Sequence, residues 1–153
     1  MRKFEKISFE QFKKDVSPSE KLYEDYNLPV RETKYAAGYD FEVLEDFTLK
    51  PNETKKVPTG IKVNMNNDEV LLLVVRGGIG FKYNVRLCNQ VGVVDKDYYN
   101  NKDNEGHIFL KLQNESDIDF NVKKHDKICQ GIFTKFLTVD DELDEFTERT
   151  SDY

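Results

Sequence analysis

From Tyr39 onward the chain consists of short apolar stretches separated by clusters of turn-forming residues. Residues 61–65 and 108–112 alternate apolar with polar side chains, which is the period-two pattern of a strand with one buried face. Turn clusters such as those at 51–53 and 100–106 recur at intervals of roughly 8 to 12 residues, a spacing typical of sandwiches and barrels. The pattern therefore predicts an all-β sandwich or barrel.

The longest apolar run is Val70–Val75, with six residues. It predicts a strand that is buried on both faces or buried against another subunit, and it is far shorter than the ~20 residues that cross a bilayer. Residues 1–12 lack the apolar block of a signal peptide. Cys88 and Cys129 show no CxxC spacing, so we interpret them as two small buried residues in a reducing compartment. We expect a cytoplasmic protein without a membrane partner.

The segment before the strands has the signals of helices. Ser8 and Ser17 each stand three residues before a Gln or Glu, which is the spacing of a capping box, and Pro18 fits a first helical position. Residues 8–27 therefore predict two short helices. We expect residues 1–30 to form a helical extension that packs on the barrel or on a neighbouring subunit.

The charge of the chain is concentrated at one end. The chain has 23 basic and 29 acidic residues, and residues 140–153 hold seven acids and one Arg, so the remaining 22 of each balance. A neutral body has no basic face for nucleic acid, although a few placed cations can still hold a small anion. We expect one barrel over residues 31–139, followed by an acidic tail over residues 140–153.

Two segments place polar residues where phosphate could bind. Asp40 follows Ala-Ala-Gly-Tyr, where small residues allow a close approach of the backbone, although an Asp after Gly is commonly turn chemistry. Arg76 is followed by three glycines in four positions, which expose backbone N–H groups beside a guanidinium suited to phosphate oxygens. This turn matches neither a Walker A loop nor a dinucleotide fingerprint.

Two further segments carry polar groups that could bind a ligand or take part in a reaction. A strand pair with a tight turn at Gly92 would project Asn89 and Asp95, with Tyr98 three residues beyond. The amide can recognise a base edge, the ring can cover a sugar, and the carboxylate can orient and deprotonate a water. A polar hairpin with a solvated Asp is the alternative. Gln130 interrupts the apolar residues of a later strand, so it has either a structural partner or a ligand.

Taken in order, the four segments resemble the motifs of the trimeric dUTPase family. The family patterns AGxDL, PRSS or PRSG, Asn followed by GxIDxDYxG, and GxRxxQ correspond to four stretches of this chain. These are Ala37–Phe41, Val75–Gly78, Asn89 with Gly92–Tyr98, and His125–Gln130. The third match is the specific one, and the resemblance extends from about Tyr39 to Arg149.

The resemblance implies a jelly-roll β-barrel subunit, here with a short N-terminal helical extension. It also implies a homotrimer with active sites at the subunit interfaces, in the cytoplasm of a bacterial or phage-infected cell. The implied reaction is the Mg²⁺-dependent conversion of dUTP to dUMP and pyrophosphate. Mg²⁺ prefers oxygen ligands and retains waters, so phosphates with an outer-shell carboxylate suit it.

The resemblance also implies a role for each matching residue. Asp95 would be catalytic and hold the water that attacks the α-phosphorus, and Asp40 would reach the water shell of the metal. Asn89 and the backbone around Gly92 would bind uracil, and Tyr98 would pack on the deoxyribose. The residues implied to contact the phosphates are Arg76, Gly77, Gly78 and Gln130.

The chain departs from the family pattern at several positions. Gly77 replaces the family's Ser, and a lost donor at a transition-state charge costs ~10²- to 10³-fold in rate. Val75, His125 and Lys127 replace the usual Pro, Gly and Arg. The family's Gly-rich arm, which closes over the triphosphate of a neighbour, has no counterpart in Thr147–Tyr153, so we expect the triphosphate to be held more loosely.

Three functions are compatible with these residues. The first is a dUTP diphosphatase whose hydrolysis is impaired. The second is a non-hydrolysing relative that binds or sequesters a nucleotide or acts as a regulator, such as a viral antagonist of nucleotide signalling. The third is a structural jelly-roll protein in which the motifs serve only the fold. The motifs favour the first function.

Overall fold

A computed structural model describes residues 1–152 and has an almost entirely antiparallel β architecture with three short helices. The strands are β1 (Lys3–Lys6), β2 (Tyr39–Glu42), β3 (Phe47–Leu49), β4 (Thr54–Pro58), β5 (Ile61–Asn64), β6 (Glu69–Val75), β7 (Val85–Leu87), β8 (Gly92–Asp95), β9 (Phe109–Asn114), β10 (Phe120–Val122) and β11 (Lys127–Lys135). The helices are α1 (Phe9–Asp15), α2 (Glu20–Asp25) and α3 (Gly77–Tyr83), with a 3₁₀ turn at Lys96–Tyr98.

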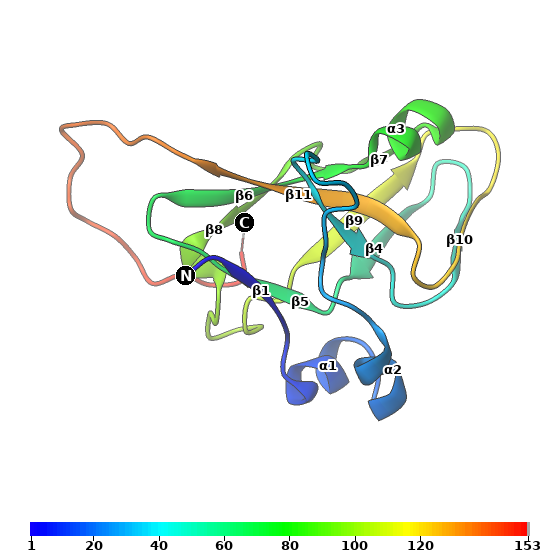
Figure 1. Ribbon diagram of the computed structural model, residues 1–153, viewed down its shortest axis with the longest axis horizontal. Coiled ribbons are helices and arrows are strands. Elements are labelled where there is room, and N and C mark those ends of the chain that lie inside the picture. Colours follow the sequence, from blue (N-terminus) through cyan, green and yellow to red (C-terminus); the bar gives the residue numbers. More distant parts are fainter. Residues whose placement is uncertain (153) are drawn as a thin grey trace.

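The strands of the described chain form four sheets that fold into a jelly-roll barrel (Figure 1). The largest sheet has the order β2-β11-β6-β8, and a second sheet has the order β4-β9-β7. Two-stranded sheets β1-β5 and β3-β10 complete the barrel. The prediction of an all-β jelly-roll barrel is therefore confirmed.

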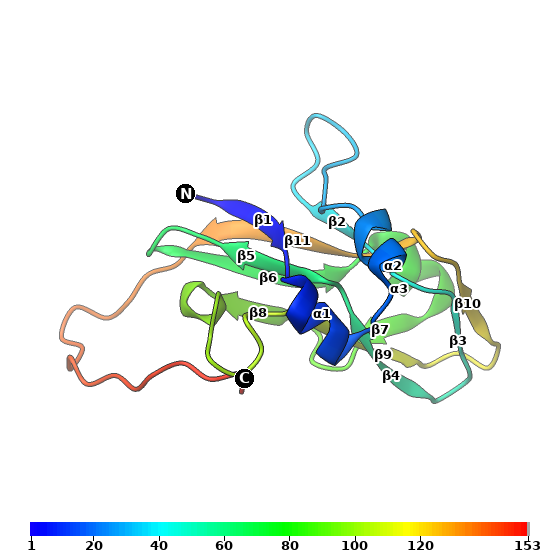
Figure 2. The same cartoon turned by 90° about the horizontal axis from the view of Figure 1, so that it is seen from below.

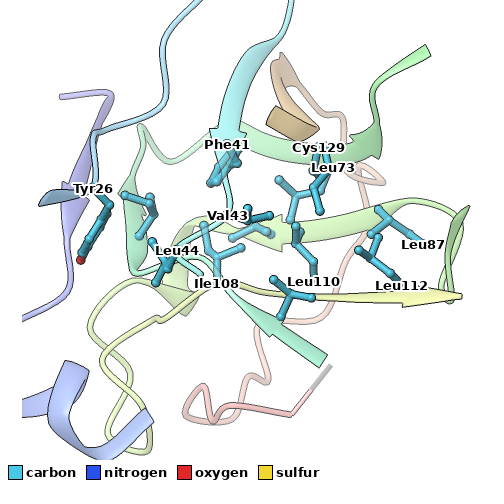
Figure 3. Packing of buried hydrophobic residues seen from close by; sticks show 14 of the residues in the cluster. Tyr26, Phe41, Val43, Leu44, Leu73, Leu87, Ile108, Leu110, Leu112 and Cys129 are labelled. Carbon is cyan, nitrogen blue, oxygen red and sulfur yellow. The ribbon is translucent and has the colours of Figure 1, made fainter. Parts of the chain in front are cut away.

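The core lies between the two larger sheets. Figure 3 shows Leu73 and Cys129 from one sheet facing Leu110 and Leu112 from the other. In β9 the residues Leu110 and Leu112 are buried while Lys111 between them is exposed. The period-two pattern of the sequence thus gave the correct buried face for this strand.

Strand β6 has two unlike faces. Leu71 and Leu73 are buried in the core, whereas Leu72 and Val74 on the other face are only half-buried. On the neighbouring strand β8, Val93 is 47% exposed. Burial on both faces within one chain, the first of the two predictions for this strand, is therefore wrong. The outer face of this sheet is therefore apolar and partly exposed.

The N-terminal extension contains the two predicted helices. The Ser8 side chain accepts a hydrogen bond from the Gln11 N–H, as the capping box predicts. The prediction for Ser17 is wrong, because α2 is capped by Ser19 and the Ser17 hydroxyl accepts instead from the Ser19 N–H at 3.1 Å. The short strand β1, which pairs with β5, precedes the helices and was not predicted.

The extension packs on the barrel of its own chain, below the sheets in Figure 1. Phe12 stacks on Tyr26 with ring centroids 5.7 Å apart. The Tyr26 hydroxyl donates to the Gly60 carbonyl at 2.8 Å, and burial raises the pKa of this phenol. An aromatic cluster therefore joins the extension to the start of β5. The division of the chain at residues 30 and 139 stays a prediction.

Both cysteines are free thiols. Burial raises the pKa of the Cys129 thiol to about 12, which agrees with the predicted small buried residue. Cys88 is only half-buried, so the same prediction is wrong for this residue. Within residues 1–152, no helix has the length and apolar character needed to span a membrane.

Candidate active site in two halves

A cavity of about 520 Å³ opens beside the chain corner at residues 88–91, between the two larger sheets. Its walls combine apolar side chains with a few polar groups. They include Leu73, Leu87, Asn89, Gly92, Tyr98 and Phe109. Three of these, Asn89, Gly92 and Tyr98, are residues that the sequence analysis assigned to a nucleoside. A cavity of this size and mixed character is typical of small-molecule sites.

The corner differs from the predicted hairpin. Strand β7 pairs with β9 and strand β8 pairs with β6, so the two strands flanking the corner belong to different sheets. The turn is made at Gln90, which has φ 65°, and not at Gly92. Gly92 begins β8, where a Cβ atom would lie 3.1 Å from the Leu73 Cβ. The glycine is therefore explained by close strand packing.

The Asn89 side chain is exposed at this corner. Its backbone carbonyl accepts a hydrogen bond from the Val91 N–H at 2.7 Å. The side-chain amide makes no hydrogen bond to any other residue between 1 and 152, so both its donor and its acceptor remain available at the cavity. An amide of this kind can recognise a base edge.

Tyr98 is buried, with 1% of its surface exposed, and its side chain borders the cavity. The hydroxyl donates to the His107 carbonyl at 2.9 Å and accepts from the Asn104 amide nitrogen at 2.9 Å. Two hydrogen bonds thus fix the position of the phenol oxygen. The ring, and not the hydroxyl, is the part that can face a ligand.

Asp95 ends β8 close to this cavity. One carboxylate oxygen, Oδ2, lies 2.8 Å from Nη1 of Arg149, and the side chain of Asp95 is 48% exposed. The Arg149 guanidinium also lies 3.4 Å from Asp97 Oδ1 and 5.7 Å from the Tyr98 ring centre. The acidic tail runs away from the end of β11 and returns to make these contacts (Figures 1 and 2). The contact between Arg149 and Asp95 was not predicted from the sequence.

A second group of predicted residues lies at the start of the 76–83 segment. Arg76 Nε is 3.3 Å from Asp40 Oδ1, and Gln130 faces Asp40 in the register of β2 with β11. Arg76 Nη2 also contacts Glu32 Oε2 at 2.9 Å, a partner that the sequence did not indicate. The Gln130 amide has no hydrogen-bond partner in the described chain. Arg76 and Gln130, predicted to contact phosphate, therefore lie together with Asp40, predicted to reach the metal's water shell.

Three glycines explain the shape of this group. A Cβ on Gly38 would lie 2.0 Å from Gln130 Oε1, so the Gln130 side chain rests directly on the backbone of Gly38. Gly77 and Gly78 begin helix α3, whereas the sequence had predicted a turn here. Both are exposed, and a Cβ at either position would meet no atom within 4 Å. A side chain at residue 77 would thus fit without strain.

The two groups lie toward opposite ends of strand β6. Asp95 pairs with Val70 at its beginning, whereas Arg76 follows Val75 at its end. With a rise of roughly 3.3 Å per residue, these six steps separate the ends by roughly 20 Å. A single chain therefore holds the predicted site residues in two separate groups. We call the group with Asp95 and Tyr98 the predicted nucleoside half, and the group with Arg76 the predicted phosphate half.

The fold and the motifs have close counterparts among known proteins. The family model named dUTPase matches residues 24–152. Deoxyuridine 5′-triphosphate nucleotidohydrolase from Lactococcus lactis subsp. lactis is 44% identical over 128 residues, covering 83% of this chain and 85% of the relative. The crystal structure of dUTPase from Streptococcus mutans has a TM-score of 0.72 and 38% identity, and covers 90% of this chain and 98% of that one.

A more distant structure supports the fold alone. It is a mutant dUTPase from phage phi11 of S. aureus, described with a structural Mg(II) ion, with a TM-score of 0.70 and 19% identity; it covers 95% of this chain and 98% of that one. Fold and motif order thus define a jelly-roll protein of the nucleotide-hydrolase class. The chain belongs to the dUTPase family.

Proposed function

We propose that the chain hydrolyses dUTP to dUMP and pyrophosphate. The observation that carries this proposal is the cavity bounded by Asn89, Gly92 and Tyr98, with the Asp95 carboxylate close by. Family membership supports this proposal, because the similar proteins from Lactococcus lactis and Streptococcus mutans are named as dUTP-hydrolysing enzymes. The comparisons do not favour a non-hydrolysing relative.

The nucleoside half suits a deoxyuridine. The unpaired Asn89 amide offers a donor and an acceptor for the uracil edge. Gly92 contributes backbone to the cavity lining, and the Tyr98 ring would support the sugar. A site built to hydrogen-bond uracil rejects a base with the wrong donor pattern, because its polar groups would be left unpaired.

Asp95 is the proposed general base. In this step the carboxylate accepts a proton from water as the water oxygen bonds to the α-phosphorus. The bond from the α-phosphorus to the bridging oxygen breaks, and pyrophosphate leaves with that electron pair. Because Asp95 is half-exposed, water can reach it. The Arg149 contact engages Oδ2 and leaves Oδ1 for the water.

The phosphate half is formed by Arg76, Gln130 and the backbone of Gly77 and Gly78. The guanidinium is a fixed fork for phosphate oxygens, and the unpaired Gln130 amide can donate to them. Arg76 must exchange its contacts with Glu32 and Asp40 for the phosphates. These contacts keep the guanidinium in the phosphate half until the substrate binds.

Mg²⁺ fits this half as a partner of the substrate. No group of three or more metal-ligating side chains occurs in the part of the chain that the structure describes. Phosphate oxygens and waters would therefore be the main ligands, and Asp40 would hold a water of that shell. When bound, the ion neutralises phosphate charge.

We further propose a homotrimer in which each active site combines halves from different subunits. The separation of roughly 20 Å along β6 supports this arrangement, because one chain does not bring its own halves together. The half-buried Leu72 and Val74 and the exposed Val93 provide an apolar face for the neighbour. The free thiols agree with a cytoplasmic location.

A turnover assay tests the proposed activity. The protein is incubated with dUTP and Mg²⁺, and pyrophosphate release is measured beside matched reactions with UTP and dCTP. We expect release from dUTP and much less from the other two nucleotides. Asp95→Asn is the control for a contaminating hydrolase. No release above buffer at high protein concentration would contradict the proposal.

A further inference from the structure

We propose that the N-terminal segment over residues 5–15 is a positioning element for Tyr98. It holds the loop over residues 99–107, and this loop fixes the ring that separates deoxyribose from ribose in the nucleoside half. The inference rests on the proposed function, since it deepens the role of Tyr98 in that site. Residues 5–15 lie outside the four family motifs.

The 99–107 loop surrounds Tyr98 closely. The phenol oxygen is held between the His107 carbonyl and the Asn104 amide nitrogen, each at 2.9 Å. The Asn101 amide nitrogen donates to the Tyr98 carbonyl at 2.8 Å. Gly106 has φ +89°, and a Cβ there would lie 2.7 Å from the Tyr98 carbonyl oxygen. A shift of this loop would therefore move the ring.

The N-terminal segment fastens the loop at two exposed or half-buried points. The Ser8 backbone N–H and hydroxyl both donate to the Glu105 carboxylate at 2.6 Å. The Tyr99 hydroxyl donates to Glu5 at 2.8 Å. Lys62 lies 3.2 Å from Glu105 Oε2 and balances its charge. Contacts separated by more than 90 residues in sequence thus join the two segments.

The third point is a buried histidine. His107 is 0% exposed, and its Nδ1 lies 2.7 Å from Oδ2 of Asp15 at the end of α1. Its Nε2 must be the acceptor, because the Gly60 N–H donates to it at 2.9 Å. The proton is therefore on Nδ1 and points to Asp15. The His107 carbonyl accepts a hydrogen bond from the Tyr98 hydroxyl. By fixing His107, Asp15 therefore also helps to fix the position of the Tyr98 phenol.

The ring of His107 also touches the cavity wall. Its centre is 4.1 Å from that of Phe109, which lines the cavity. Excluding an added hydroxyl by packing alone gives a modest preference, ~10²-fold in known cases. Such a preference depends on the exact place of the Tyr98 ring. We therefore expect the loss of the Asp15 contact or of the Ser8 contact to lower the preference for deoxyribose without abolishing nucleotide binding.

The first test measures dUMP and UMP binding by calorimetry, since binding does not depend on hydrolysis. Asp15→Ala is expected to lower the preference for dUMP over UMP about tenfold. Asp15→Asn keeps an acceptor for the His107 proton and should retain most of the preference. Equal preference in wild type and Asp15→Ala would overturn the inference while leaving the proposed function standing.

A matched pair of cap variants provides the second test. Ser8 and Ser19 each cap a short helix by accepting a backbone N–H at 3.1 Å, but only Ser8 contacts Glu105. Ser8→Ala and Ser19→Ala should lower thermal stability similarly, whereas only Ser8→Ala should lower the dUMP preference. An equal loss in both would overturn the inference, even where Asp15→Ala fails to fold. A wild-type protein that does not distinguish dUMP from UMP would overturn both the Tyr98 assignment and this inference.

Discussion

Arg149 and Asp95, 54 residues apart, form an ion pair with Nη1 and Oδ2 at 2.8 Å. This contact joins the acidic tail to the proposed general base. Ion pairs between partly exposed groups contribute little to stability, typically below about 1 kcal/mol. The pair therefore positions the carboxylate and can open when the site fills.

Asp95→Asn should abolish the proton acceptor while preserving the shape of the site. We expect turnover of dUTP to fall by about 10²- to 10⁴-fold. The dUMP affinity should change little, because Asp95 does not line the cavity. Asp97→Asn is the control, since Asp97 contacts the same guanidinium but is 64% exposed. Steady-state kinetics with near-normal turnover in Asp95→Asn would contradict the assignment.

Gly77→Ser should raise turnover. It restores a hydroxyl donor beside Arg76 in a position where a Cβ meets no atom within 4 Å, and such a donor is worth ~10²-fold or more in other enzymes. Gly78→Ser is the matched control, because it occupies equally open space. Both variants should stabilise α3 by a few tenths of a kcal/mol through helix propensity. An increase in turnover confined to Gly77→Ser is expected.

Gly38→Ala should damage the phosphate half by displacing Gln130. The added methyl group would overlap Oε1, which lies 2.0 Å from the position of the Cβ. We expect a several-fold rise in KM for dUTP and little change in dUMP binding. In a Gln130→Ala background the same substitution should have almost no additional effect, because the clashing atoms are gone. Additive effects in this double-mutant cycle would show that the two residues act independently.

The stability of the fold should depend on pH through His107. Burial lowers the pKa of His107 below its ordinary value of 6.5, although the Asp15 hydrogen bond and charge oppose this. Below pH 6.5 the unfolded chain binds this proton before the folded chain does, so stability is complete above 6.5 and falls as the pH drops below it.

Urea unfolding measures this effect. The midpoint should fall between about pH 7.5 and about pH 5.5, a window above the ordinary titration of carboxylates. His107→Gln should be less stable at the higher pH, because the ring contacts are lost, but should show a smaller fall. A wild-type midpoint that does not change across the window would contradict the buried neutral histidine.

The sequence predicted correctly those features that depend on residues close together in the chain. The alternation in residues 108–112 identified the buried face of β9, and the order of the four motifs identified the family. Helix α3 was missed because the three glycines of residues 77–80 suggest a turn. Tertiary context overrides that preference, and the two exposed glycines at its start need no side-chain packing.

The remaining errors involve long-range contacts. The sequence could not show that β7 and β8 belong to different sheets, because hairpin signals report only on neighbours in the chain. The cap at Ser19, the Glu32 contact of Arg76 and the Arg149 contact of Asp95 likewise depend on the folded chain. The roles of the predicted site residues stay predictions, and their division into two groups could be seen only from the strand register.

Mixing two inactive variants tests the divided site most directly. Asp95→Asn removes the general base of the nucleoside half, and Arg76→Ala removes the guanidinium of the phosphate half. If each site uses halves from two subunits, trimers refolded from an equal mixture should recover about a quarter of wild-type turnover. Arg76→Ala mixed with Gln130→Ala, which damage the same half, should give no more turnover than the two variants measured separately. Turnover of the first mixture no higher than the sum of the separate variants would contradict the account.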